Sequence, residues 1–360
     1  MNKLRLYKDE NLDLLRRQKD ELADNAAAVL IHHPKICELI NSWEEIPEEL
    51  PHDFPEEIQA YFDFFKSKYS KAPIQILKKG QDFFARKGDI YLAMLGFYSL
   101  PYCYAFADGA QVLIRSKRII ENIGERLGET GSFLLSLFEP GAFYDDKKAF
   151  LVCAKVRLIH AFSRCFIKKY AADWDVRFGE PINQEDLIGT NLAFSLMVLR
   201  GMRKLGQEPT PFEALNVLRY WAWIGDLLGL NVGYWPETPK ESFELERLIR
   251  KRHLKHSDAG EKLTRALINF YQDTIPEPAL AKEAESIVSF FIGDEASKAV
   301  AIKQGIKIDG NILGLFLKIM GLRSYGAGKS YNGIYSEFRK GQLEQFGKVL
   351  QVQVPVLSRS

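Results

Sequence analysis

The sequence predicts an all-α protein, because most of its segments repeat apolar residues at helical spacing and few carry strand patterns. Of its 360 residues, 46% are hydrophobic and 27% are charged, which is typical of a globular chain long enough for one large or two modest domains. We expect a single large helical domain. In it, N-terminal helices in residues 1–87 pack on a core formed by residues 88–235, and C-terminal helices in residues 236–360 complete it.

The first third of the chain supplies three predicted helical regions. Residues 4–24 have the pattern of one charged amphipathic helix, and residues 56–69 form another after an acidic, proline-punctuated linker. Asp89 is a plausible N-cap for the apolar run 90–107. That run contains four tyrosines and is broken by Pro101, so we expect one or two buried helical pieces and no membrane span.

The later elements follow from the same periodicity. We predict helices over residues 115–127, 149–167, 183–203 and 212–230, and a short strand or tail over 349–357. Asn183, with Asp186 three residues on, resembles a capping box and places the start of its helix.

Composition excludes several functional classes. The net charge of +2 gives no strong field toward nucleic acid or an anionic membrane, so we expect neither as a partner. None of the four cysteines forms a CxxC or CxxCH motif, which is typical of thiols in a reducing compartment. The first 20 residues are charged and lack the apolar centre of a signal peptide, so we expect a cytoplasmic protein. The sequence does not indicate its oligomeric state.

Two arginines and a histidine lie at regular spacing in the apolar run 149–167. Arg157, His160 and Arg164 share one helical face, since they are spaced i, i+3 and i+7. The rest of the run is hydrophobic nearly all round, which is typical of a buried helix. Because unpaired buried charge is costly, we expect an anionic group against this face. A haem fits, with its iron bound by His160 and its propionates by Arg157 and Arg164.

Other metal sites find little support among the six histidines. No HxxxH or HExxH pair is present, and His253 and His256 lie in a basic run that we expect to be a solvated face. A metal at His160 therefore needs its other ligands from a cofactor, such as the four nitrogens of a porphyrin. The alternative is a core histidine that is hydrogen-bonded to a backbone carbonyl.

Arg126 and Thr130 form a second candidate pair, one helical turn apart. They could lie over the open face of a haem and hold bound dioxygen, or they could be a surface arginine and a threonine that closes the helix. Gly124, Gly128 and Gly131 on the same segment would permit close approach of a flat ligand or of another helix.

The motifs together resemble the haem oxygenase family of latex-clearing proteins and MpaB-type oxygenases. The resemblance rests on the RxxHxxxR pattern of residues 157–164, the stretch GEPINQEDLIGT at 179–190, the aromatic and glycine segment 221–229, and the upstream RxxxT of Arg126 and Thr130. It covers about residues 88–230, and the order and spacing of these motifs are more specific than any one of them.

This resemblance implies a mostly helical fold with a globin-like, haem-binding core and haem b as the cofactor. His160 would be the axial iron ligand, Arg126 and Thr130 would line the opposite face, and at least one of Arg157 and Arg164 would meet a propionate.

The chain also departs from the family. Latex-clearing proteins carry a glutamate, taken as a base, where this chain has Ala110. Asp108 is close by, but a shift of two residues turns a helical side chain by about 200°. Glu129 stands where those enzymes have lysine. These differences, with the absence of an export signal, favour the intracellular MpaB-type branch over rubber cleavage.

Three functional hypotheses follow. The first is an oxygenase that uses dioxygen on a small apolar, unsaturated substrate. The second is a protein that holds haem or a gas ligand without turnover. The third is a helical protein without haem, in which the arginines pair with core carboxylates such as Glu125, Glu129 or Asp186.

Overall fold

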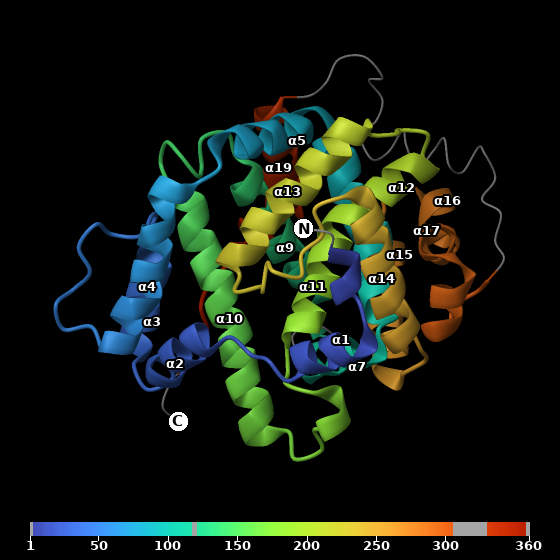
Figure 1. The fold of residues 1–360 in the computed structure, drawn as a ribbon. Helices are drawn as coiled ribbons and strands as arrows, with labels where there is room; N and C mark the ends of the chain where they lie inside the picture. The colour runs from blue at the N-terminus through green and yellow to red at the C-terminus, as the bar shows by residue number, and fades with distance from the viewer. Residues whose placement is uncertain (1–2, 117–120, 305–329, 358–360) are drawn as a thin grey trace.

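The computed structural model describes residues 3–116, 121–304 and 330–357, and helices dominate these ranges. No strand forms within them, although one isolated antiparallel bridge joins Phe106 and Leu254. Labels follow Figure 1. The α-helices of the first half are α1 (Asp9–Arg16), α2 (Glu21–Leu30), α3 (Pro34–Ser42), α4 (Glu56–Lys68), α5 (Ile74–Met94), α6 (Leu100–Tyr104), α7 (Ala107–Arg115), α9 (Ile123–Phe138) and α10 (Lys148–Tyr170).

The described part of the second half is also mainly helical. Its α-helices are α11 (Gln184–Leu192), α12 (Val198–Lys204), α13 (Pro211–Leu227), α14 (Pro239–His253), α15 (Asp258–Thr274), α16 (Pro278–Lys282), α17 (Ala284–Ala299) and α19 (Tyr331–Phe346). Short 3-10 helices are η1 (Lys3–Leu6), η2 (Tyr69–Lys71) and η4 (Val176–Phe178), and π-helical turns are η3 (Leu95–Ser99) and η5 (Ala193–Met197).

Helix α10 lies between two groups of helices. In Figure 1, α2, α3 and α4 lie on one side of it, and α9, α11 and α13 lie on the other, with α14 to α17 beyond them. Contacts of α10 with α2, α4, α13, α9 and α7 show that both groups pack against this helix. The buried apolar residues form one continuous core cluster, so the predicted single helical domain is confirmed.

Aromatic side chains connect the helices at the centre of this core. The Phe138 ring stacks on Phe84 with centroids 4.4 Å apart and on Tyr220 with centroids 4.7 Å apart, which joins α9 to α5 and α13. The indole Nε1 of Trp221 donates to the Tyr91 hydroxyl at 2.7 Å, so these buried polar groups are satisfied.

The prediction of one helix over residues 4–24 is wrong. The chain forms η1, α1 and then a new helix α2, because Asp20 leaves helical geometry and caps α2 through the Ala23 amide at 3.4 Å. Asp89 is likewise not an N-cap, since α5 runs through it to Met94.

The apolar run 90–107 forms buried helical pieces, as predicted. It continues α5 into the π-turn η3 and then α6, with Pro101 just after the π-turn, where the chain stays helical although proline supplies no backbone donor. The Ser99 hydroxyl donates to the Ala193 carbonyl in the second π-turn at 2.7 Å, so the two irregular turns are joined. None of the described helices is long and apolar enough to cross a membrane.

Most of the remaining helix predictions hold. Helix α10 covers the predicted run 149–167, and Asn183 caps α11 by accepting from the Asp186 amide at 3.0 Å. The prediction over 115–127 holds only from Ile123, where α9 begins; α7 ends at Arg115, and residues 117–120 lie outside the described ranges. The C-terminal tail forms no strand in its described part, and Val354 instead exchanges two backbone hydrogen bonds with the Asn41 side chain.

The contact between α5 and α13 predicts a stability effect at Gly80. A Cβ there would overlap the Tyr220 ring, so Gly80→Ala should lower the free energy of unfolding by about 1–3 kcal/mol. Thermal or urea unfolding of the full chain measures this. The matched control is Gly341→Ala on α19, where nothing lies within 4 Å of the added atom and better helix propensity should stabilise slightly. Equal effects of the two substitutions would contradict this packing.

Candidate functional site

Helix α10 presents a buried side and a half-buried side. Leu158, Ala161 and Arg164 are buried, whereas Val156, His160 and other residues at helical spacing keep accessible surface. The half-buried residues of this face are Val152, Val156, Ile159, His160, Ser163 and Phe166, which we call the α10 stripe. The stripe occurs because residues three and four apart share a face of the helix. His160 therefore lies on the part of α10 that its neighbours cover least.

His160 has no hydrogen-bond partner among the described residues. Its Nδ1 is buried and unpartnered, and no described residue bonds the other ring nitrogen. Burial, together with the positive charges of Arg164 and Arg126, lowers the pKa of the imidazole to about 3. The ring is consequently neutral at physiological pH, which is the form that binds metals. A core histidine bonded to a carbonyl, the alternative left open by the sequence, is not the arrangement seen.

The anionic partner expected for Arg157 comes from the protein. Asp20 binds this guanidinium bidentately, with Nε–Oδ2 at 2.6 Å and Nη2–Oδ1 at 2.8 Å. The remaining Nη1 donates to the Leu227 carbonyl over a long 3.4 Å, and the guanidinium lies 4.6 Å from the centroid of the Phe64 ring. The interaction fastens α10 to the start of α2 and leaves Arg157 little free donor capacity.

Arg164 is held by the same helix but less completely. Its Nε donates to Asp24 Oδ1 at 2.6 Å, while its Nη2 is buried and bonds no described residue. The side chain is almost fully buried. A buried guanidinium with an unsatisfied donor is costly, so Nη2 is a candidate donor to an anionic group brought by a ligand.

The carboxylates suggested by the sequence as partners of these arginines serve elsewhere. Glu125 lies 3.3 Å from Lys348, Glu129 lies 3.0 Å from Arg126, and Asp186 lies 3.1 Å from Arg16. Sequence periodicity missed Asp20 and Asp24 because they belong to α2, far from α10 along the chain.

Arg126 and Thr130 lie on α9, which packs against α10. Arg126 comes close enough to His160 for its charge to lower the pKa of the imidazole. Its Nη1 donates to Glu129 Oε2 at 3.0 Å, and the Thr130 hydroxyl donates to the Arg126 carbonyl at 2.9 Å. Helix α9 continues to Phe138, so Thr130 does not close it. The glycines of α9 leave room for the side chains of Phe270, Leu350 and Phe338 from neighbouring elements. Of the two alternatives predicted for these glycines, the structure therefore shows close approach of other protein segments and not of a flat ligand.

Asp108 belongs to a different cluster. It is buried, and its carboxylate lies 3.2 Å from His253 Nδ1, 3.3 Å from Lys255 and 3.6 Å from Arg16. Three cationic partners leave it poorly suited to act as a base for a substrate near His160. The expectation of a solvated His253 is wrong, since the side chain is buried among carboxylates. Ala110, which stands at the family's glutamate position, is fully buried.

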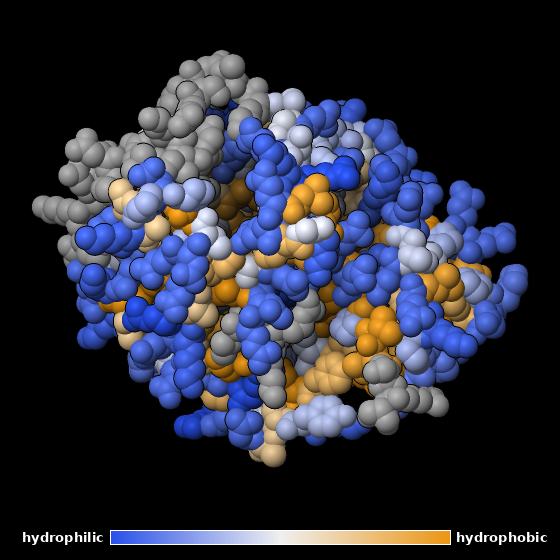
Figure 2. Space-filling view, turned by 180° about the vertical axis from the view of Figure 1, so that it is seen from behind, coloured by the Kyte–Doolittle hydropathy of each residue, from blue (hydrophilic) through white to orange (hydrophobic). Residues whose placement is uncertain are grey.

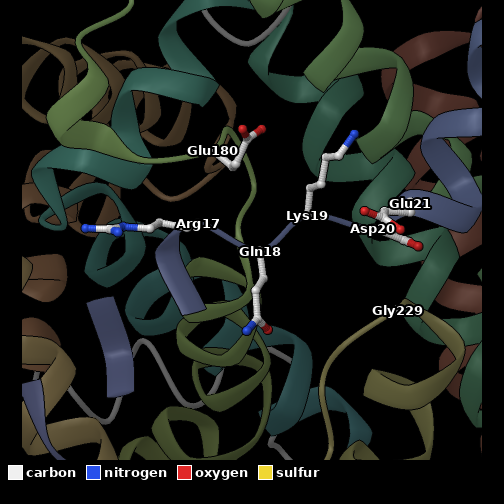
Figure 3. A pocket seen from close by; sticks show the side chains of 7 residues that line it. All are labelled: Arg17, Gln18, Lys19, Asp20, Glu21, Glu180 and Gly229. Carbon is white, nitrogen blue, oxygen red and sulfur yellow. The ribbon is translucent and has the colours of Figure 1, made fainter. Parts of the chain in front are cut away.

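A separate polar depression lies at the link between α1 and α2. Its volume is about 490 Å³, and Arg17, Gln18, Lys19, Asp20, Glu21, Glu180 and Gly229 line it. Figure 3 shows that the side chains of Arg17, Gln18 and Lys19 point in different directions and do not converge. Its lining lacks large apolar side chains, so it does not match an apolar substrate. The opposite face of the molecule is mostly hydrophilic, but hydrophobic side chains gather in its hollowed central and lower part (Figure 2).

No group of three or more metal-binding side chains occurs in the described ranges, so His160 would need its further iron ligands from a cofactor. The residues that the structure brings together are His160, Arg164 and Arg126, with Thr130 one turn along α9. Such a site offers one neutral nitrogen ligand, one unsatisfied buried donor and one cation that is half exposed.

Comparison with known proteins gives two findings. Residues 106–301 match the family described as ER-bound oxygenase mpaB/B′/rubber oxygenase, catalytic domain, and this range contains every predicted site residue. The fold resembles a solved structure described as "Structure of Latex Clearing Protein LCP in the closed state", with a TM-score of 0.70, 18% sequence identity and 94% of each chain covered. At that identity, the structural likeness shows the fold alone. No curated protein matches the sequence.

The Asp20–Arg157 pair predicts a large and specific stability effect. Asp20→Asn keeps a capping oxygen for α2 but leaves the buried guanidinium without a countercharge, so unfolding free energy should fall by about 3–5 kcal/mol. The control is Asp173→Asn, whose carboxylate is 77% exposed beside Arg115 and should matter by about 0–1 kcal/mol. Urea denaturation compares the two, and a loss under 1 kcal/mol for Asp20→Asn would show that the pair does not hold α10.

Proposed function

The chain belongs to the family of mpaB-type and rubber oxygenase catalytic domains, and from this premise we propose that it is a haem b-dependent oxygenase in which His160 is the axial iron ligand. The carrying observation is the neutral, unpartnered imidazole on the α10 stripe. A buried polar atom without a partner calls for an explanation, and a metal bond to the ring supplies one.

The side chains around His160 fit a haem on chemical grounds. One ring nitrogen would bind iron, and the unsatisfied Nη2 of Arg164 would donate to a propionate. Arg157 could take part only through Nη1, since Asp20 occupies its other donors. When bound, the haem would supply the redox chemistry by which dioxygen is activated.

Arg126 and Thr130 are the proposed catalytic residues of the opposite side. Arg126 uses Nη1 for Glu129, which orients the guanidinium while leaving other N–H donors available. A fixed cation beside the oxygen-binding side would stabilise negative charge that develops there. The Thr130 hydroxyl already donates to the backbone, so its contribution would be as an acceptor.

The proposed substrate is a small, apolar, unsaturated molecule oxidised by dioxygen. No carboxylate replaces the family's glutamate, because Ala110 is apolar and Asp108 is engaged by three cations. Removal of an allylic proton by a base at that position is therefore not available to this chain. For this reason we place the chain nearer the intracellular mpaB-type branch than the rubber-cleaving branch. The family description alone does not distinguish the two branches.

The alternative of a structural arginine–histidine cluster is favoured by one observation, the pairing of Arg157 with Asp20 and of Arg164 with Asp24. It leaves the His160 imidazole unexplained, however, since a structural histidine would be hydrogen-bonded. A haem or gas carrier without turnover would use the same ligand and differs from the oxygenase in lacking oxygen consumption.

The ligand assignment predicts loss of cofactor on substitution of His160. Purified His160→Ala incubated with haemin should show little or no Soret band from bound haem, because one protein bond to the iron is removed. The control is His256→Ala, a half-exposed histidine that lies outside the site. Unchanged haem content and spectrum in His160→Ala would refute the assignment, provided that circular dichroism shows both variants folded.

The catalytic assignment predicts the opposite pattern for Arg126. Arg126→Ala should retain haem but lower the rate of oxygen consumption with an unsaturated apolar substrate by about 10²-fold or more, because a charge-stabilising donor is lost. The control is Arg247→Ala, an exposed arginine on α14. An oxygen electrode measures the rate. Loss of haem from Arg126→Ala would indicate that this residue holds the cofactor, and an unchanged rate would remove it from catalysis.

A further inference from the structure

A dense cluster of buried charges lies where α1, α7, α11 and α14 meet. None of its members influences the pKa of His160, so it is separate from the proposed haem site. Helix α1 contributes Arg16, α7 contributes Asp108, α11 contributes Glu185 and Asp186, and α14 contributes Arg252 and His253, with Lys255 just beyond α14. Apart from Lys255, these side chains are at most 20% exposed.

His253 occupies the centre of this cluster between two carboxylates. Its Nδ1 lies 3.2 Å from Asp108 Oδ2, and its Nε2 lies 3.0 Å from Glu185 Oε1. An ionised carboxylate only accepts hydrogen bonds, and a neutral imidazole has only one N–H to donate. Both nitrogens can therefore donate to the two ionised carboxylates only when His253 is an imidazolium. A neutral ring would instead donate to Asp108 and accept at Nε2 from Arg16 Nη1, which lies 3.4 Å away.

The charges around the ring support the same protonation state. Burial alone would lower the pKa of His253, and Arg16, whose Nη1 is 3.4 Å from Nε2, also opposes protonation. The hydrogen bonds to Asp108 and Glu185 outweigh both effects and raise the pKa above its ordinary value. Burial disfavours ionised Asp108 and Glu185, but His253 and the neighbouring cations outweigh it and lower their pKa values.

The remaining charged groups are matched with one another. Arg252 binds Glu185 at 2.8 Å and reaches Asp9 at 2.8 Å and Asp13 at 2.6 Å on α1. Arg16 binds Asp186 at 3.1 Å and donates to the Phe178 carbonyl. His253 is the member of the cluster whose side-chain type has its ordinary pKa nearest neutral pH.

The cluster ties the start of α7 to α11 and α14, and α7 also packs against α15. Asp108 lies in the first turn of α7, and the same junction is joined to the chain after α14 by the Phe106–Leu254 bridge and by a hydrogen bond from the Lys255 amide to the Ala105 carbonyl at 3.3 Å. Helix α7 also contacts α10, the helix that carries His160. The end of α14 thus contributes, with α15, to holding α7 beside α10.

We propose that His253, as an imidazolium, is a positioning residue that clamps the start of α7 between α11 and α14, and that loss of its proton to solvent releases α7. The neutral ring can keep only one of its two carboxylate bonds, which leaves Asp108 or Glu185 short of a donor. If α7 is released, access to the α10 stripe around His160 increases as the pH rises. This consequence rests on the proposed function.

Hydrogen exchange followed by mass spectrometry tests the clamp in the full chain without cofactor. Because folding raises the pKa of His253, its contribution is complete below the ordinary histidine value and is lost as the pH rises through the raised pKa. After correction for intrinsic exchange rates, peptides from residues 106–115 should exchange faster from pH 6 to pH 9. Each unit by which folding raises the pKa corresponds to about a ten-fold increase in local opening.

Two variants give the matched comparison. His253→Gln should show fast exchange in 106–115 already at pH 6 and little further pH dependence. His256→Gln, three residues away and half exposed, should behave like the parent. A flat profile in the parent, or the same pH dependence in His253→Gln, would overturn the clamp.

A spectroscopic measurement covers the case in which His253→Gln does not fold. In the parent, ¹⁵N spectra of labelled histidine should show one imidazolium, with both nitrogens protonated, persisting above the pH at which exposed histidines lose their protons. Asp108→Asn should lower the pH at which that proton leaves. A neutral His253 at pH 6, or an unchanged titration in Asp108→Asn, would contradict the proposal.

Haemin uptake separates the clamp from the proposed function. A rate of uptake that rises with pH in the parent but not in His253→Gln supports gating of the site. Uptake that is independent of pH, while exchange in α7 is not, would overturn the gating. Failure of the parent to bind haemin at all would refute the proposed cofactor and leave the exchange and ¹⁵N results to decide the clamp alone.

Discussion

The arrangement of this protein depends on the need to neutralise positive charge inside α10. Arg157 and Arg164 point into the protein on one helix, and burial of an unpaired guanidinium is costly. Helix α2 meets that need with Asp20 and Asp24, one turn apart, so two ion pairs fasten α2 across α10. The interruption before α2 follows from the same requirement, because Asp20 both caps the new helix and binds Arg157.

With these two ion pairs formed, the His160 ring still has no hydrogen-bond partner among the described residues, and Arg164 Nη2 also remains unsatisfied. Its two cationic neighbours act in the same direction as burial and keep the ring neutral. The arrangement differs from that of His253, a buried imidazole that lies between two carboxylates and whose pKa is raised. One fold therefore contains two histidines whose pKa values shift in opposite directions, and the neighbouring charges account for the difference. The neutral ring suits a metal, and the charged ring suits a structural clamp.

Local sequence patterns predicted much of the fold and part of the site. The helical class, α10, the Asn183 cap and the family resemblance all rest on residues close together in the chain, and the structure or the family match bears them out. An anion against Arg157 was predicted as well, but its identity was not, since Asp20 is brought there by tertiary packing. The prediction of a solvated face around His253 was wrong for the same reason. Its basic run looks exposed in sequence, yet α1, α7 and α11 supply four carboxylates against it, Asp9, Asp13, Asp108 and Glu185.

The most direct test of this account is pulsed EPR of the full chain, reconstituted with haemin and labelled with ¹⁵N only at histidine. The account predicts hyperfine coupling between the iron and a histidine nitrogen, and the loss of that coupling when residue 160 alone is changed to a non-ligating side chain. Bound haem with no histidine coupling, or with coupling that survives the change at residue 160, would contradict it.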